Sequence, residues 1–167
     1  MSHVQATVPT ISGWQGTYIG KGRMRYILEG FGGNAFPNVN ASGQVTLTTA
    51  GTAYNVLLQV PSGHRLINVA IQHMNSSGNT SNTAGQQSTL YRQPIQNVTG
   101  STAGLIVVFD VLSFCGSLNF VMGVNWESSS QNYIFTFTST SSNRLVNIEV
   151  IIEYITPFVE AGIGVEG

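Results

Sequence analysis

Charged residues are scarce in this sequence, which holds only six basic and seven acidic residues among its 167. Charged side chains make up 8% of the chain. A typical soluble domain carries about 25%, and these charges keep it soluble and monomeric. Lys21 is the one lysine and the net charge is −1, so the clustered Lys and Arg that neutralise nucleic-acid phosphates are missing. We therefore predict no direct contact with nucleic acid.

The residues that carry most enzyme and metal chemistry are also few. Asp110 is the one aspartate, which excludes an Asp-rich calcium loop, and the three histidines show none of the close spacings of zinc ligands. Glu149 and Glu153 share a predicted strand face, but their backbones lie about 13 Å apart, too far for the paired carboxyl groups of a glycosidase. A cross-strand pair that uses Glu127 or Asp110 stays open. We predict no catalytic residue, no metal site, no cofactor and no enzymatic activity.

The sequence also lacks segments for disulfide bonding, for export and for crossing a membrane. Cys115 is the one cysteine, so the chain forms no internal disulfide. Residues 1–13 hold no apolar core flanked by basic residues, so we expect no secretory signal, and no stretch reaches the ~18 apolar residues of a membrane span. We expect such a protein to leave its cell by lysis or inside a particle, if it works outside.

Uncharged polar residues and short apolar runs make up most of the rest. Ser, Thr, Asn and Gln account for 57 residues, and such side chains can be buried against a neighbouring subunit without stranding a charge. Apolar and polar residues alternate, as in strands with one buried face, over 17–28, 45–49, 54–60, 65–73, 105–114, 118–126, 133–138 and 144–155.

This alternation predicts an all-β, single-domain protein over 1–167, an antiparallel two-sheet β-sandwich of the jelly-roll type with about eight strands. A proline and a glycine at 61–63 favour a turn, which predicts a hairpin between the third and fourth runs. Residues 1–16 and 157–167 are predicted to be extended arms.

Half of the basic residues lie within five positions, as Lys21, Arg23 and Arg25. The alternation places the three on one face of the first predicted strand, as a stripe about 13 Å long. One interpretation is an exposed edge strand whose charges discourage further pairing. The other, which we predict, is contact with an anionic partner, either lipid headgroups or acidic side chains of a neighbour. Trp14 and Tyr18 suit the same interface, although packing within the protein explains them equally well.

A long polar segment interrupts the strands at 75–89, without a charged residue and without an apolar residue beyond Ala84. A segment of this length inside a compact domain is usually a functional loop. We predict an exposed loop at one end of the sandwich. The residues expected to contact a partner or a host surface are Asn75, Asn79, Asn82 and Gln86.

The strand pattern, the uncharged polar surface, the missing secretory signal and the two arms together resemble a known family. The chain is similar over 17–155 to the small single jelly-roll capsid proteins of tailless icosahedral viruses with an internal membrane, such as those infecting Thermus. The resemblance implies a capsid building block located in the virion, which associates with itself, with a second capsid protein and with the internal membrane. Few ion pairs can form here, which departs from proteins of hot environments.

Two alternatives stay open. The receptor-binding tip of a phage tail fibre would share the surface rich in Ser, Thr, Asn and Gly, and its loop 75–89 would contact the host. A carbohydrate-binding module would use exposed aromatic residues beside amides, as Trp126, Tyr133 and Tyr91 can provide. Nothing in the spacing of the residues selects the carbohydrate-binding module.

Overall fold

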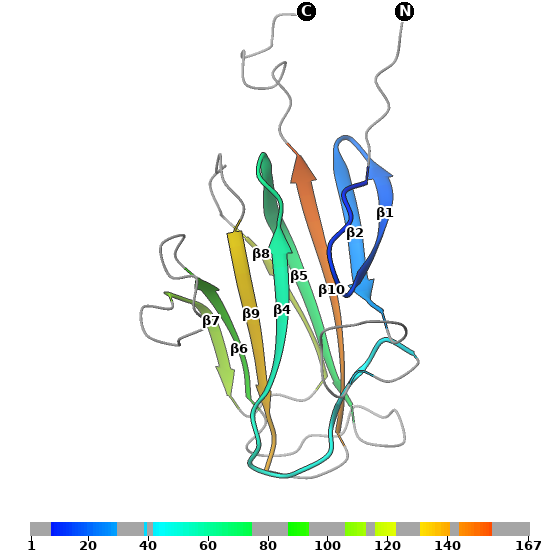
Figure 1. Ribbon diagram of the computed structural model, residues 1–167. Coiled ribbons are helices and arrows are strands. Elements are labelled where there is room, and N and C mark those ends of the chain that lie inside the picture. Colours follow the sequence, from blue (N-terminus) through cyan, green and yellow to red (C-terminus); the bar gives the residue numbers. More distant parts are fainter. Residues whose placement is uncertain are drawn as a thin grey trace, which may run out of the picture.

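The computed structural model of the protein describes residues 8–29, 39, 42–74, 87–93, 106–112, 116–122, 131–140 and 144–154. Ten strands in these ranges form two antiparallel sheets that pack face to face (Figure 1). Sheet A holds, in spatial order, β1 (Trp14–Gly20), β2 (Arg23–Leu28), β10 (Arg144–Tyr154), β5 (His64–Met74) and β8 (Gly116–Val121), with β3 (Val45–Leu47) beside β10. Sheet B holds β4 (Tyr54–Val60), β9 (Gln131–Thr138), β6 (Gln87–Gln93) and β7 (Ile106–Leu112). The predicted all-β two-sheet sandwich is confirmed.

The strand order is that of a jelly roll. Strand β2 pairs with β10, β4 with β9, β5 with β8, and β6 with β7, so the eight strands match like the two arms of one long hairpin. Successive pairs alternate between sheet A and sheet B, and the pairings of β10 with β5 and of β6 with β9 roll the hairpin up. Strands β1 and β3 are additions to this eight-strand core. Jelly rolls occur in capsid and lectin domains alike, so the fold by itself does not choose a function.

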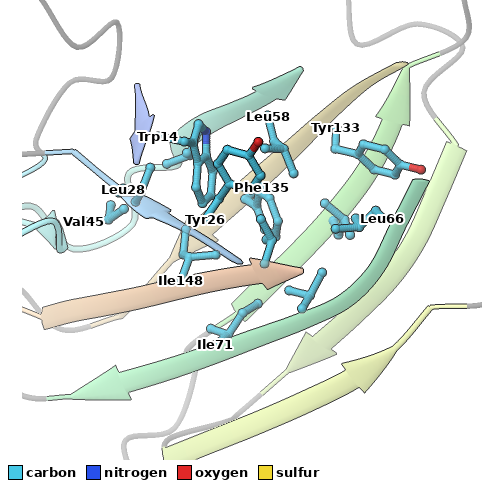
Figure 2. Close-up of a cluster of buried hydrophobic side chains, with 14 of the residues drawn as sticks. Trp14, Tyr26, Leu28, Val45, Leu58, Leu66, Ile71, Tyr133, Phe135 and Ile148 are labelled. Atoms are coloured by element: carbon cyan, nitrogen blue, oxygen red, sulfur yellow. The ribbon is translucent and has the colours of Figure 1, made fainter. Parts of the chain in front are cut away.

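Apolar residues of alternating parity fill the space between the sheets (Figure 2). Tyr26 and Ile148 from sheet A and Leu58 and Phe135 from sheet B are among the buried residues. Burying a side chain of this size contributes about 1.5–3 kcal/mol relative to leaving it exposed. The strand faces predicted to be apolar over 54–60, 133–138 and 144–155 therefore form the core.

Specific contacts join the two sheets along both sides of the sandwich. On one side Trp14 of β1 donates an indole hydrogen bond from Nε1 to the Leu57 carbonyl of β4, at 2.9 Å. On the other side Phe109 of β7 stacks on Phe120 of β8, with ring centroids 4.2 Å apart. Because β4 and β7 are the outer strands of sheet B, these contacts cover both of its edges with residues of sheet A.

The first predicted strand is in fact two strands joined by a tight turn. Lys21 and Gly22 have φ values of 55° and 75°, and positive φ at both central residues is what a type I′ hairpin turn requires. A two-residue turn pairs residues of opposite parity, as Gly20 and Arg23 do here, but the register shift between Tyr18 and Gly20 returns the hairpin to pairs of equal parity, so Tyr18 pairs with Met24. The sequence pattern therefore hid the hairpin.

Two further expectations about the connections are wrong. Strands β4 and β5 do not form a hairpin, because the turn at 61–63 carries the chain from sheet B to sheet A, as successive strands of a jelly roll require. The segment 75–89 is not a loop throughout, because Gln87–Gln93 forms β6, while 75–86 lies outside the described residues. Neutral polar residues such as Ser88 and Thr89 concealed this strand.

The N-terminal segment is not a free arm over its whole predicted length. Ile11 is buried, and Trp14 lies in the core. The Tyr26 hydroxyl donates to the Pro9 carbonyl at 2.7 Å, which fixes the chain against β2 before β1 begins. Residues 1–7 and the predicted arm 157–167 lie outside the described residues. In the ranges that the structure covers, no helix has the length and apolar character needed to cross a membrane.

Candidate functional site

The predicted basic stripe is divided by the hairpin. Lys21 sits in the turn, while Arg23 and Arg25 share the outer face of β2. Arg23 contacts Glu153 of β10 at 3.1 Å, and Arg65 of β5 contacts the same carboxylate at 3.3 Å. Because β2 lies between β1 and β10, the interpretation as an edge strand is wrong, and so is the placement of Lys21 on the strand face. Contact with an anionic partner stays a prediction for these residues.

Trp14 and Tyr18 were predicted to lie at the same interface, and the structure separates their roles. Trp14 is 3% exposed, with its ring centroid 6.1 Å from that of Phe135, so the core holds the side chain and its predicted contact with a partner is wrong. Tyr18 is exposed, and its hydroxyl accepts a hydrogen bond from the Gly22 amide at 3.1 Å. Of the two aromatic residues, only Tyr18 is exposed, and its contact with a partner stays a prediction.

A hollow of about 490 Å³ lies on the outer face of sheet A. Ile27, Glu149, Ala70 and Asn119 stand side by side across β2, β10, β5 and β8 in one row of its lining. The methyl group of Ala70 is shorter than the side chains of Glu149 and Asn119 on either side, so the hollow is deepest near Ala70. The described residues of the lining are Ile27, Leu28, Ser42, Gly43, Ala70, Ile71, Gln72, Asn119, Asn147, Ile148 and Glu149.

The rim of this hollow is built where β2 ends and β3 begins, on the same edge of β10. Gly43 has a φ of 76°, and a Cβ atom at this position would meet the Leu28 carbonyl oxygen at 2.4 Å. Glycine therefore lets the two backbone segments approach closely. Farther along the wall, the Asn147 amide donates to the Gln72 side-chain oxygen at 3.2 Å, which orients both amides. The sequence shows these residues only as polar strand positions, because strand register alone brings them together.

The outer face of sheet B has a different pattern, with an apolar row between polar rows. Leu57, Ile134, Tyr91 and Val107 are paired in register across all four strands. Val107 is 54% exposed and the other three are half-buried.

The polar side chains beside this row are hydrogen-bonded to one another. Thr136 donates to the Asn55 side-chain oxygen at 2.7 Å, while Gln87 and Thr89 donate to one Asp110 carboxylate oxygen at 2.8 and 2.9 Å. Asp110 is the one charged residue on this face among the described strand residues.

A buried polar pair joins the two sheets in the interior. His73 of β5 is hydrogen-bonded through Nε2 to the Ser88 hydroxyl of β6, and its ring lies edge-on to Phe137 of β9 at 5.9 Å. Burial lowers the pKa of His73 to about 4, because the charged imidazolium is poorly solvated there. A serine and a histidine in contact can form a nucleophile and its base. Both side chains are buried here, so the pair contributes to packing between the sheets and does not face a substrate.

The remaining predicted residues give little further evidence. Asn75, Asn79, Asn82, Gln86 and Trp126 all lie outside the described residues. Within the described ranges, no three residues among His, Cys, Asp and Glu gather as a metal site would require.

The two described aromatic residues suggested for carbohydrate binding, Tyr133 and Tyr91, do not share one surface. Tyr133 is buried in the core, while Tyr91 lies half-buried on the outer face of sheet B.

Comparisons with known proteins find likeness in structure alone. No protein family matches the sequence, and no curated protein is similar to it. A carbohydrate-binding module of family 29 is similar in structure, with 9% identity, a TM-score of 0.37, and coverage of 89% of this chain and 83% of that one. A family 29 variant complexed with cellulohexaose gives 9% identity and the same TM-score, over 86% and 76% of the two chains. These values carry no conclusion about what the present chain binds.

Proposed function

We propose that this protein is a structural subunit of a virion, a capsid building block that assembles with copies of itself through the outer face of sheet B. The observation that carries the proposal is the apolar row on that face, formed by Leu57, Ile134, Tyr91 and Val107. Exposed apolar surface rimmed by polar residues is typical of contact sites between proteins. The scarcity of charge in the whole sequence supports the same function.

The distribution of charge over the two sheets favours sheet B as the association surface. Asp110 is the one charged residue on the outer face of this sheet among the described strand residues, and it accepts two hydrogen bonds from its own sheet, so burial of this face encloses one hydrogen-bonded carboxylate and no other described charge. The outer face of sheet A instead carries Arg23, Arg25, Arg65, Glu149 and Glu153. A subunit of this kind buries its neutral face against a neighbour and leaves its charged face open to solvent or to an anionic layer.

The size of the face sets the strength of the association. Four strands of about seven residues cover roughly 14 Å by 23 Å between the outer strand axes, given the usual strand spacing and rise. A stable interface buries about 800 Å² on each partner, so this face supplies the centre of a larger contact. We expect weak, concentration-dependent association of the purified protein, which repeated contacts strengthen in a shell.

Val107→Lys is expected to reduce this self-association. The substitution places a charge in the apolar row, and burial of an unpaired charge opposes assembly, while the exposed site leaves folding intact. In sedimentation velocity over a range of concentrations, we expect the wild type to form dimers or larger species. Val107→Lys should need an about tenfold higher concentration to reach the same degree of association, which corresponds to a loss of about 1.4 kcal/mol in the free energy of association.

The matched control is Val121→Lys, because Val121 is 88% exposed on the outer face of sheet A, where it pairs with Asn68. This variant gains the same charge on the opposite face and should associate like the wild type. A wild type that stays monomeric throughout, or equal effects of the two substitutions, would refute assembly through sheet B.

A further inference from the structure

We infer that the hollow on the outer face of sheet A binds a neutral carbohydrate through its amide side chains. This site lies on the face opposite the proposed association surface and does not depend on it. Its volume of about 490 Å³ falls within the ~300–1,000 Å³ of small-ligand sites.

The wall of the hollow offers both hydrogen-bond donors and acceptors. Gln72, Asn119 and Asn147 each carry an amide, which can donate and accept at once, and Ser42 adds a hydroxyl. The bond between Asn147 and Gln72 uses the nitrogen of one amide and the oxygen of the other, so each retains its second polar group. Neighbouring hydroxyls of a sugar ring likewise donate and accept, so one amide can bond two of them.

The charge of the described lining disfavours other classes of ligand. Glu149 is the one charged residue among the described lining residues, which include no Arg, Lys or His. A phosphate or carboxylate ligand would therefore meet a like charge without a compensating cation. A single carboxylate among neutral amides is also too few anionic ligands for a cation site. Glu149 instead suits acceptance of hydrogen bonds from hydroxyl groups, which carboxylates make well.

Apolar groups complete the match to a sugar ring. Ile27 is exposed and stands in the same row as Ala70, on either side of Glu149. A sugar ring has a face of C–H groups as well as an edge of hydroxyls, so it can lie on Ile27 and Ala70 while the amides bond its edge. Because strands carry most of these side chains, the site is rigid before the ligand arrives.

The expected affinity is modest. The described residues of the lining include no aromatic ring, and aromatic stacking supplies much of the binding energy at many polar sites. Hydrogen bonds exchanged with water contribute only about 0.5–1.5 kcal/mol each. We therefore expect a Kd near the millimolar range, about −4 kcal/mol.

The inference can be tested with cellohexaose, maltohexaose and mannohexaose as neutral probes and hexagalacturonate as the anionic probe. Binding is measured by titration calorimetry and by ligand-detected NMR. Val107→Lys serves as the background protein, so that self-association does not interfere. We expect at least one neutral hexaose to bind at about millimolar Kd, and the anionic probe to bind at least tenfold more weakly.

Two substitutions test whether the hexaose binds in the hollow. Ala70→Leu fills the centre of the hollow, and Gln72→Ala removes an amide from its wall. Each substitution should raise the Kd of the hexaose by tenfold or more. The matched control, Asn55→Ala, removes an amide from the outer face of sheet B and should leave the affinity unchanged. The inference fails if no neutral hexaose binds, if the anionic probe binds as well, or if Ala70→Leu binds like the wild type. None of these outcomes bears on assembly through sheet B.

Discussion

Trp14→Ala is expected to lower the free energy of unfolding by about 4 kcal/mol, within the ~3–5 kcal/mol that loss of a buried tryptophan or phenylalanine side chain costs. The Trp14 ring packs near Phe135 in the core, and its removal leaves a cavity between the sheets. The Leu57 carbonyl also loses its indole donor. Because protein domains are stable by about 5–15 kcal/mol, a loss of this size removes a large fraction of the total stability.

The matched variant Trp14→Phe separates packing from hydrogen bonding. It keeps most of the apolar volume and removes the donor to Leu57, so we expect a loss of about 1–3 kcal/mol, the cost of an unsatisfied buried polar group. Urea denaturation followed by far-UV circular dichroism gives both values. A loss below 1 kcal/mol for Trp14→Ala would show that the tryptophan does not hold β1 against sheet B.

The protein is expected to lose about 3 kcal/mol of stability to the His73 side chain alone between pH 7 and pH 3.5. The pKa of His73 is about 4 in the folded protein, against about 6.5 for histidine in an unfolded chain. The unfolded state therefore binds the proton more tightly, and stability falls as pH drops below 6.5 until the folded protein is also protonated below pH 4. Each unit of this pKa difference corresponds to about 1.4 kcal/mol.

His73→Gln is the diagnostic variant, because glutamine can bond Ser88 but does not titrate. Although its stability at pH 7 should be lower, its loss between pH 7 and pH 3.5 should be smaller than that of the wild type by about 3 kcal/mol. His64→Gln, at the start of β5, makes the same substitution outside the buried pair and controls for the exchange of histidine for glutamine itself; the smaller loss should be specific to His73→Gln. Parallel pH profiles for the wild type and His73→Gln would contradict the buried inter-sheet pair.

The sequence pattern predicted which residues face the core, because burial of one face imposes a period of two on every strand. Met24, Tyr26 and Leu28 are buried as their alternation indicated, and so are Phe135 and Phe137. The alternation could not show which strands pair. A strand with one buried face alternates in the same way whether it forms a hairpin with the preceding strand or crosses to the other sheet. The pairing of β5 with β10 rather than with β4 is therefore visible only in the structure.

The candidate surfaces were beyond prediction for a related reason. Ala70 and Glu149 are 79 positions apart, and only the register of β5 against β10 makes them neighbours. Likewise Leu57 and Tyr91 belong to separate strands that each show one outward apolar residue, and such single residues are ordinary on protein surfaces. By contrast, the basic residues drew attention because they are close in sequence, yet the structure assigns one of them to a turn and pairs Arg23 with Glu153.

The most direct test of assembly through sheet B compares one small spin label at two exposed valines. Val107→Cys and Val121→Cys, each in a Cys115→Ser background, carry an uncharged nitroxide on the outer faces of sheet B and sheet A. As the protein is concentrated, electron paramagnetic resonance should show the label at position 107 becoming immobilised, while the label at position 121 stays as mobile as in dilute solution. Equal mobility of the two labels at the highest concentration would contradict the account.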